Sequence, residues 1–215
     1  MSIAHKLLSF SLSLFTLSLL AVNSAAAQSA AAGFVLAGTA AVHAGSQNES
    51  GPMRLEAIPA TTADGTASTR IEFDLPGGDY IEVRRAVPCP AAGHGCAAAA
   101  GAWLNPVRSA EVQVMPPGEA DQPLWFLPAL LPAPGPGYTV QDDAATGLPL
   151  SLEYAGGGGV RIEIRYSAYR LVDGVAIPFH IERYLNGTLN WDLRVESASA
   201  AAPPASDFDL GGGGQ

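Results

Sequence analysis

Lysine is almost absent from this sequence. Lys6 is the only lysine among 215 residues, and it lies in an N-terminal segment that we expect to be removed. The remaining chain has ten arginines and twenty acidic residues, so its formal charge is −10. The absence of lysine excludes Schiff-base and pyridoxal chemistry, a phosphate-loop lysine and a Ser-Lys dyad. Net negative charge without a cluster of basic residues also argues against nucleic acid as a partner.

Long apolar runs are absent outside the N terminus. There, His5 and Lys6 precede an apolar stretch from Leu7 to Val22, and small residues follow up to Ala27. A short basic start, an apolar stretch and an Ala-x-Ala site are typical of a secretory signal. The alternative is a membrane anchor, but the stretch includes several hydroxyl side chains and is shorter than the roughly 20 apolar residues of a span. We therefore expect cleavage near Ala27 and a periplasmic or secreted product without a transmembrane segment.

Cysteine is scarce, and its placement is informative. Cys89 and Cys96 enclose a short loop of proline, alanine, glycine and one histidine. In an oxidising compartment this arrangement favours a disulfide within the loop. A metal site with His94 as third ligand is the alternative, but a second pair of ligands is missing nearby. We expect the disulfide, no metal and no other cofactor.

Glycine and proline, by contrast, are abundant, and they separate short segments in which apolar and polar residues alternate. Residues 70–75 place Ile71 and Phe73 on one face, and residues 160–166 place Ile162 and Ile164 on one face. This period of two predicts an antiparallel sheet with one buried and one solvated face. We expect a mobile stretch at residues 28–33, one domain at 34–210, and a disordered tail at 211–215.

The last hairpin allows a prediction of register. Residues 179–184 and 189–195 flank Asn186-Gly187, which suggests a two-residue turn. Such a turn would place Ile181 opposite Asp192, whereas a three-residue loop would place Ile181 opposite Trp191 and make one face apolar. The apolar pattern therefore favours the three-residue loop, with Gly187 in a left-handed conformation.

One segment breaks the alternating pattern. Residues 121–131 contain Trp125, Phe126 and Leu127 between prolines, which predicts a short helix or turn packed on the sheet. Such an aromatic pair usually fills a core. The alternative is a lid over a ligand site. The connection that follows, residues 132–137, is rich in proline and glycine, and the region 125–142 shows no further strand pattern.

Catalytic motifs are missing. The sequence has no Gly-x-Ser-x-Gly nucleophile elbow, no His-Glu-x-x-His and no dinucleotide fingerprint. His43, His94 and His180 are the histidines after Ala27, and none has another histidine at ligand spacing. His180 and Glu182 fall on the same outward face, where a surface pair explains them. We therefore expect a protein that is not an enzyme.

Several short patterns resemble those of LolA-like periplasmic proteins, the superfamily of lipoprotein carriers. The clearest are in the C-terminal third: D-x-x-T-G-L-P at residues 143–149, Y-x-x-V-x-G-x-x-x-P across residues 166–179, and a terminal D-x-x-F type ending at 206–208. A looser match to the front of these proteins covers residues 38–40 and 70–72. Residues 125–128 are similar to a W-F-F-P element in uncharacterised bacterial members.

The resemblance implies a fold and a site. The expected fold is mainly β: a curved antiparallel sheet that forms an open half-barrel around an apolar cavity, with one or two short helical segments as a lid. The resemblance also suggests Arg70 as an arginine that would pair with the lid. The expected cavity and lid residues are Ile71, Phe73, Trp125, Phe126, Leu127, Ile162, Ile164, Ile181 and Trp191.

Two functions remain open from the sequence. The first is a non-catalytic periplasmic binding protein or carrier whose partner is a lipid or the acyl chain of a lipoprotein. The second is a structural cell-envelope protein that binds another envelope protein and fills its concave face with its own side chains. Both need the same apolar residues, so the sequence favours the first through the resemblance alone.

Overall fold

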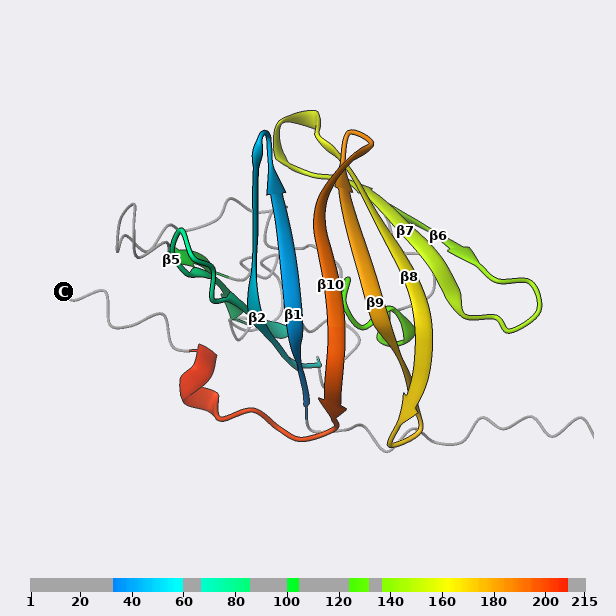
Figure 1. Cartoon of the computed structure of the whole chain (residues 1–215). Coiled ribbons are helices and arrows are strands. Elements are labelled where there is room, and N and C mark those ends of the chain that lie inside the picture. Colours follow the sequence, from blue (N-terminus) through cyan, green and yellow to red (C-terminus); the bar gives the residue numbers. More distant parts are fainter. Residues whose placement is uncertain (1–32, 60–66, 86–99, 105–123, 132–136, 209–215) are drawn as a thin grey trace, which may run out of the picture.

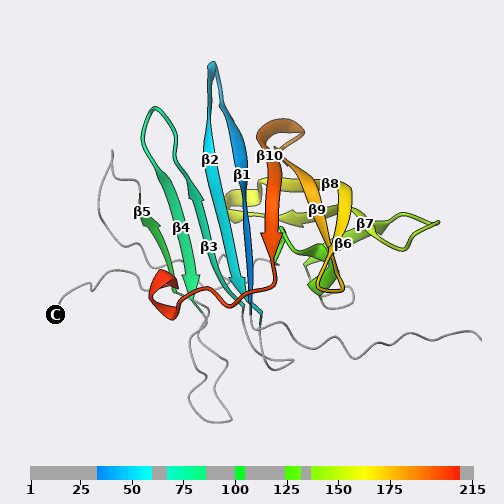
Figure 2. The same cartoon turned by 60° about the horizontal axis from the view of Figure 1, so that its bottom comes forward.

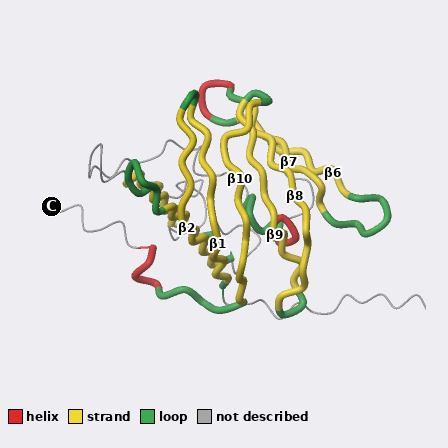
Figure 3. The backbone as a smooth tube through the Cα atoms, in the orientation of Figure 1, coloured by secondary structure: helices red, strands yellow, loops and turns green. Residues whose placement is uncertain are grey.

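The protein is mainly β, as predicted. The computed structural model describes residues 33–59, 67–85, 100–104, 124–131 and 137–208, and these form one ten-stranded antiparallel sheet with three short 3-10 turns (Figures 1 and 3). The expected signal segment, Cys89, Cys96 and the tail 211–215 lie outside the described residues. None of the described helices is long and apolar enough to span a membrane.

The sheet consists of two halves that meet at one strand pair. Its order is β5-β4-β3-β2-β1-β10-β9-β8-β7-β6, so β1 pairs with β10 and the sheet is open between β5 and β6. Figure 2 shows the two halves facing each other, with the segment 124–131 between them. The strands of the first half are β1 (Phe34–Ala44), β2 (Gln47–Ile58), β3 (Ser68–Phe73), β4 (Tyr80–Arg85) and β5 (Ala100–Leu104). Those of the second half are β6 (Tyr138–Asp142), β7 (Pro149–Ala155), β8 (Arg161–Val172), β9 (Val175–Leu185) and β10 (Thr188–Ser199).

The alternating residues explain which face of the sheet is buried. Ile162 and Ile164 of β8 are buried on the inner, concave face, whereas Arg161 and Arg165 of the same strand are exposed on the outer face. Successive side chains of a strand point to opposite faces, so the alternating sequence places the apolar residues on one face. Each aliphatic side chain buried there stabilises the fold by roughly 1.5–3 kcal/mol. The prediction that Ile162 and Ile164 share the buried face of this strand is confirmed.

The last hairpin differs from the prediction. Leu185 pairs directly with Thr188, so the turn contains only Asn186 and Gly187, both with positive φ (48° and 82°). The register then shifts by one residue at a β-bulge between Leu189 and Trp191. The predicted three-residue loop is therefore wrong, although the left-handed Gly187 is confirmed.

The bulge solves the problem that the two-residue turn creates. Without it, Ile181 would face Asp192; with it, Ile181 pairs with Leu193, and both are fully buried. An extra residue in one strand of a pair shifts the register and sharpens the local twist. The hairpin thus keeps its tight turn and its apolar face together.

The turn between β6 and β7 contains the D-x-x-T-G-L-P pattern of residues 143–149 and shows which bonds its residues form. The carboxylate of Asp143 accepts hydrogen bonds from the backbone N–H groups of Ala145 and Thr146, both at 2.8 Å. These bonds lower the pKa of Asp143 because they favour its charged form, and the bond from Thr146 has the largest effect. Gly147 follows with φ +68°. The D-x-x-T-G-L-P pattern is therefore a turn, and β6 before it is a strand that the sequence did not reveal.

Candidate functional site: the concave face and its central segment

The residues expected to form the cavity and lid lie together on the inner face. Ile71 and Phe73 come from β3, Ile162 and Ile164 from β8, and the others from β9, β10 and the segment 124–131. They belong to one apolar cluster, and each is no more than 8% exposed: Ile71, Phe73, Trp125, Phe126, Leu127, Ile162, Ile164, Ile181 and Trp191. The sequence pattern thus identified a contiguous apolar interior.

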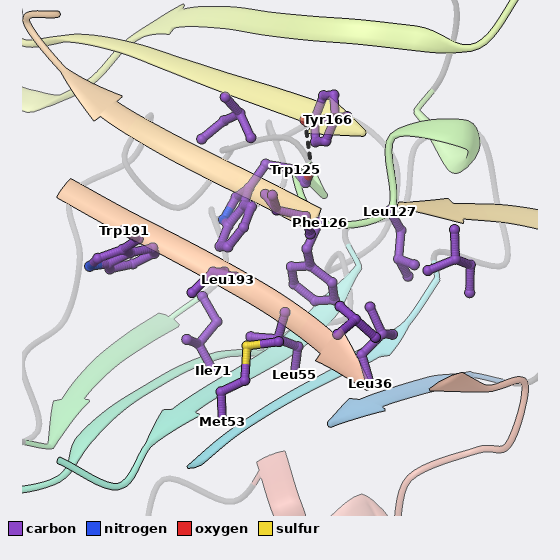
Figure 4. Packing of buried hydrophobic residues seen from close by; sticks show 14 of the residues in the cluster. Leu36, Met53, Leu55, Ile71, Trp125, Phe126, Leu127, Tyr166, Trp191 and Leu193 are labelled. Carbon is purple, nitrogen blue, oxygen red and sulfur yellow. Dashed lines mark hydrogen bonds between the residues drawn. The ribbon is translucent and has the colours of Figure 1, made fainter. Parts of the chain in front are cut away.

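The segment Leu124–Leu131 occupies this interior without joining the sheet. It makes a turn closed by a bond from the Leu127 N–H to the Leu124 carbonyl and continues into the 3-10 turn Pro128–Leu130. The Tyr166 hydroxyl on β8 donates a 2.7 Å hydrogen bond to the carbonyl of Trp125. Figure 4 shows Phe126 between the strand that carries Tyr166 and the side chains of Leu36 and Leu55 on the opposite wall. We call this segment the plug.

Aromatic rings connect the plug to both walls. The Trp125 ring lies 5.3 Å from that of Phe126 and 5.8 Å from that of Trp191 on β10. Trp191 in turn contacts Phe73 edge-on at 5.1 Å and Tyr80 at 5.6 Å. Such aromatic pairs contribute about 0.5–1.5 kcal/mol each beyond the burial of their surface. The plug therefore completes an aromatic row across the concave face.

The inner face of β4 carries charge that sequence reasoning missed. Tyr80 pairs with Phe73, which places Tyr80, Glu82 and Arg84 on the inner face. The Glu82 carboxylate accepts a bond from Arg84 Nε at 2.6 Å and one from the Tyr80 hydroxyl at 2.7 Å. Glu82 and Arg84 are only 4% and 8% exposed. Burial, reinforced by Glu82, raises the pKa of Tyr80 well above its usual value, so Tyr80 stays a proton donor.

A second arginine faces the interior from β9. Arg183 pairs with Trp191 and Ile164 across the sheet, so it lies on the inner face with them. Its guanidinium carbon sits 4.2 Å above the centre of the Trp191 ring, and its Nη1 donates to the Asn190 amide oxygen at 2.7 Å. Tyr154 on β7 lies beside it, and burial raises the pKa of Tyr154, opposed by the charges of Arg183 and Arg84. Only the alternation past Ile181 could have indicated Arg183 from the sequence.

Arg70 does not lie where a lid partner would need to be. Arg70 precedes the inward Ile71 in the alternation of β3 and therefore points to the outer face. There it forms an ion pair with Glu72 at 2.8 Å and donates to the Asp207 carbonyl at 3.2 Å. The C-terminal 3-10 turn Ala205–Phe208 packs against β3 and β4 on that face. The structure thus places Arg70 across the sheet from the plug.

The outer face holds a chain of hydrogen bonds that the sequence did not reveal. Ser167 Oγ lies 3.0 Å from His180 Nδ1, and His180 Nε2 lies 3.0 Å from Asp192 Oδ1. Serine, histidine and aspartate also form the triads of hydrolytic enzymes. In those triads Nε2 of the histidine faces the serine and Nδ1 faces the aspartate, the reverse of the arrangement here. Ser167 is exposed to solvent, whereas oxyanion stabilisation acts in water-excluded sites. The geometry therefore fits a surface bond network across β8, β9 and β10.

Metal ligands do not gather in the part of the chain that the structure describes. Within those residues, no group of three or more His, Cys, Asp or Glu side chains is placed to hold an ion. The expected disulfide, Cys89–Cys96, falls outside them. The polar groups that could meet a ligand are those on the inner face, around Glu82 and Arg183.

Comparison with known proteins identifies the fold. No protein-family model matches the chain, and no curated protein matches its sequence. A putative outer membrane lipoprotein-sorting protein domain from Vibrio parahaemolyticus superposes with a TM-score of 0.54 at 12% identity, covering 86% of this chain and 92% of that one. A DUF1329 family protein from Desulfovibrio piger gives a TM-score of 0.46 at 10% identity, covering 82% and 89%. The chain therefore has a LolA-like fold, as its sequence patterns predicted, and identities this low show the fold alone.

Proposed function

We propose that this protein is a non-catalytic binding protein or carrier for an acyl ligand in the periplasm, and that the ligand binds on the concave face. The observation that carries the proposal is the plug. The interior between the two halves of the sheet is filled by a segment that contributes no strand, so the segment can leave without breaking a strand ladder.

The composition of the interior supports an apolar ligand. Ligand sites for such molecules are concave and mostly apolar, with a few placed polar groups. Trp125, Phe126 and Leu127 are at most 5% exposed, and the surroundings that they fill are apolar, as an acyl chain requires. An acyl chain that replaces them would lie in the apolar cluster that also contains Trp191, Ile164 and Leu193. The lipoprotein-sorting domain from Vibrio parahaemolyticus shares the fold, which agrees with this assignment.

The second candidate is a structural envelope protein whose plug is a permanent part of the core. The observation in its favour is the near-complete burial of the same three residues. The two candidates differ in what the interior does when the plug is weakened: a carrier takes up ligand, and a permanent core only loses stability.

The experiment compares two truncations of buried aromatic residues on opposite faces. Trp125→Ala empties part of the interior, and Phe208→Ala removes a ring under the C-terminal turn on the outer face. Each should lower the free energy of unfolding by about 3–5 kcal/mol. We expect the parent to bind a fluorescent fatty-acid probe and Trp125→Ala to bind it more tightly, because apolar cavities accept apolar ligands. Phe208→Ala should bind it as the parent does.

Two further results bear on the proposal. Mass spectrometry of an organic extract of the native protein should show a lipid present in about equal molar amount. A parent and a folded Trp125→Ala that both fail to take up the probe would contradict the carrier and support the structural role. Ester hydrolysis that disappears in Ser167→Ala would contradict the non-catalytic part of the proposal.

A further inference from the structure

Arg84 and the half-buried Arg183 both face the interior, and within the described residues they differ in their partners. Arg84 is balanced by Glu82 at 2.6 Å, whereas Arg183 forms no ion pair with any carboxylate among the residues that the structure describes. A charge taken out of water is costly unless it is paired. A guanidinium on the wall of an apolar interior is suited to bind the anionic group of a ligand.

The guanidinium of Arg183 is held in place from two sides. Trp191 supports its flat face at 4.2 Å, and the Asn190 amide oxygen accepts from Nη1 at 2.7 Å. Asn190 is itself anchored, since its amide nitrogen donates to the His43 carbonyl at 3.3 Å. These contacts fix the plane of the guanidinium before any ligand binds, and such preorganisation lowers the cost of binding.

The β-bulge of β10 is the feature that builds this group. In a bulge, two residues of one strand stand opposite a single residue of the other. Here Leu189 pairs with Tyr184 and Trp191 with Arg183, so Asn190 is the extra residue between two paired positions. The bulge therefore corrects the register of the apolar face and also brings an amide and an indole to the same guanidinium.

The aromatic rings beside Arg183 lead to the plug. The Trp191 ring under the guanidinium is followed by Trp125 at 5.8 Å and by Phe126 at 5.3 Å from Trp125. A molecule that replaced the plug would thus have one end at the guanidinium and its length along the apolar wall.

We propose that Arg183 binds the anionic head group of the acyl ligand, so that the ligand class is an amphiphile with a carboxylate or phosphate head. The inference rests on the proposed function, because the acyl chain occupies the interior. Arginine suits this role, since its planar fork matches carboxylate and phosphate oxygens with two parallel hydrogen bonds. Neutral acyl compounds would leave the charge unpaired.

Calorimetric titration of the parent protein with four ligands of equal chain length tests the head group. The ligands are palmitate, hexadecyl phosphate, hexadecanol and hexadecyltrimethylammonium. A hydrogen-bonded charge pair should make both anions bind at least about tenfold more tightly than the alcohol, with the cation weakest. Acetate and inorganic phosphate should not compete, because they lack the chain; competition by either at the concentration of palmitate would overturn the proposal.

A matched pair of variants tests the residue. Arg183→Met should weaken palmitate binding by about tenfold and leave hexadecanol binding unchanged. Arg165→Met is the control, because Arg165 lies 4.3 Å above the ring of Tyr184 on the outer face and should affect neither ligand. If Arg183→Met does not fold, the ligand series with the parent decides alone.

The outcomes separate this inference from the proposed function. Equal binding of palmitate and hexadecanol by the parent would overturn the role of Arg183 and leave the acyl carrier standing. Binding of none of the four ligands would overturn both.

Discussion

At the scale of single residues, Glu56 is a buried acid whose hydrogen bonds are incomplete within the described part of the chain. It lies on the outer face of β2 under the C-terminal turn, and it is fully buried. Its Oε1 accepts a 2.6 Å bond from Arg54 Nε, while its Oε2 has no hydrogen-bond partner within the described part of the chain. Burial raises the pKa of Glu56 above 4.5, and Arg54 opposes this only in part.

The raised pKa determines how stability depends on pH. A carboxyl whose pKa is higher in the folded state favours folding when it is neutral. Its contribution is therefore complete below about pH 4.5 and is lost as the pH rises through the folded-state pKa. We expect Glu56→Gln, which keeps the shape without the charge, to melt at a higher temperature than the parent near neutral pH, and at about the parent's temperature near pH 4.

Glu72 provides the control for this measurement. It forms an ion pair with Arg70 of the same strand, β3, and its side chain is 36% exposed. Glu72→Gln removes an ion pair of the kind that contributes about 0–1 kcal/mol, so it should give no gain near neutral pH. A Glu56→Gln variant that is less stable than the parent near neutral pH, but not near pH 4, would show that the Arg54 ion pair outweighs burial.

At the scale of elements, the last hairpin shows what periodicity can and cannot determine. The apolar alternation of β9 and β10 correctly required Ile181 to have an apolar partner, and Asn186-Gly187 correctly indicated a turn. A two-residue turn and an apolar partner for Ile181 need registers that differ. From the sequence alone, a bulge and a longer loop satisfy both requirements equally well. The bulge depends on Asn190 reaching Arg183 and the His43 carbonyl, which are contacts between distant residues that the pattern does not contain.

The turn of this hairpin makes a prediction about Gly187. Its φ is +82°, and no atom lies within 4 Å of the position that a Cβ would take, so the cost of substitution comes from the backbone alone. Gly187→Val should lower the free energy of unfolding by about 1–2 kcal/mol in a denaturant titration. Gly187→Asn should cost clearly less, because asparagine tolerates the left-handed region. Equal losses for both variants would mean that the turn relaxes to another conformation.

At the scale of the whole molecule, the sequence predicted the class of fold and the apolar interior but not the polar part of the site. The period of two identified the strands around Ile71 and Ile162, and the break in that period identified the plug. The sequence of β4 does not predict which of its faces is buried, because Tyr80, Glu82 and Arg84 alternate with Ile81 and Val83. The orientation of β4 is explained by the C-terminal turn, which contacts β4 on the outer face and contains the buried Phe208, so Val83 is buried on that face.

The relation between the plug and the sheet provides the last prediction, which concerns Tyr166. Its hydroxyl holds the plug by the bond to the Trp125 carbonyl, and burial keeps it protonated by raising its pKa well above the usual value. Tyr166→Phe leaves that carbonyl without this donor in the plugged state, at a cost of about 1–3 kcal/mol. In a ligand-bound state with the plug displaced, water can replace the donor. The substitution should therefore lower the melting temperature and raise the affinity for the fatty-acid probe, by about tenfold.

Tyr169 on the same strand makes this test specific. Its hydroxyl donates a 2.6 Å bond to the Pro149 carbonyl at the start of β7, so this bond does not involve the plug. Tyr169→Phe should lower the melting temperature through the same chemistry and leave probe affinity unchanged. The two variants thus separate loss of a hydrogen bond from release of the plug. If Tyr166→Phe also loses stability without gaining affinity, the plug is a permanent part of the core, because only a segment that leaves the interior couples its own hydrogen bond to ligand binding.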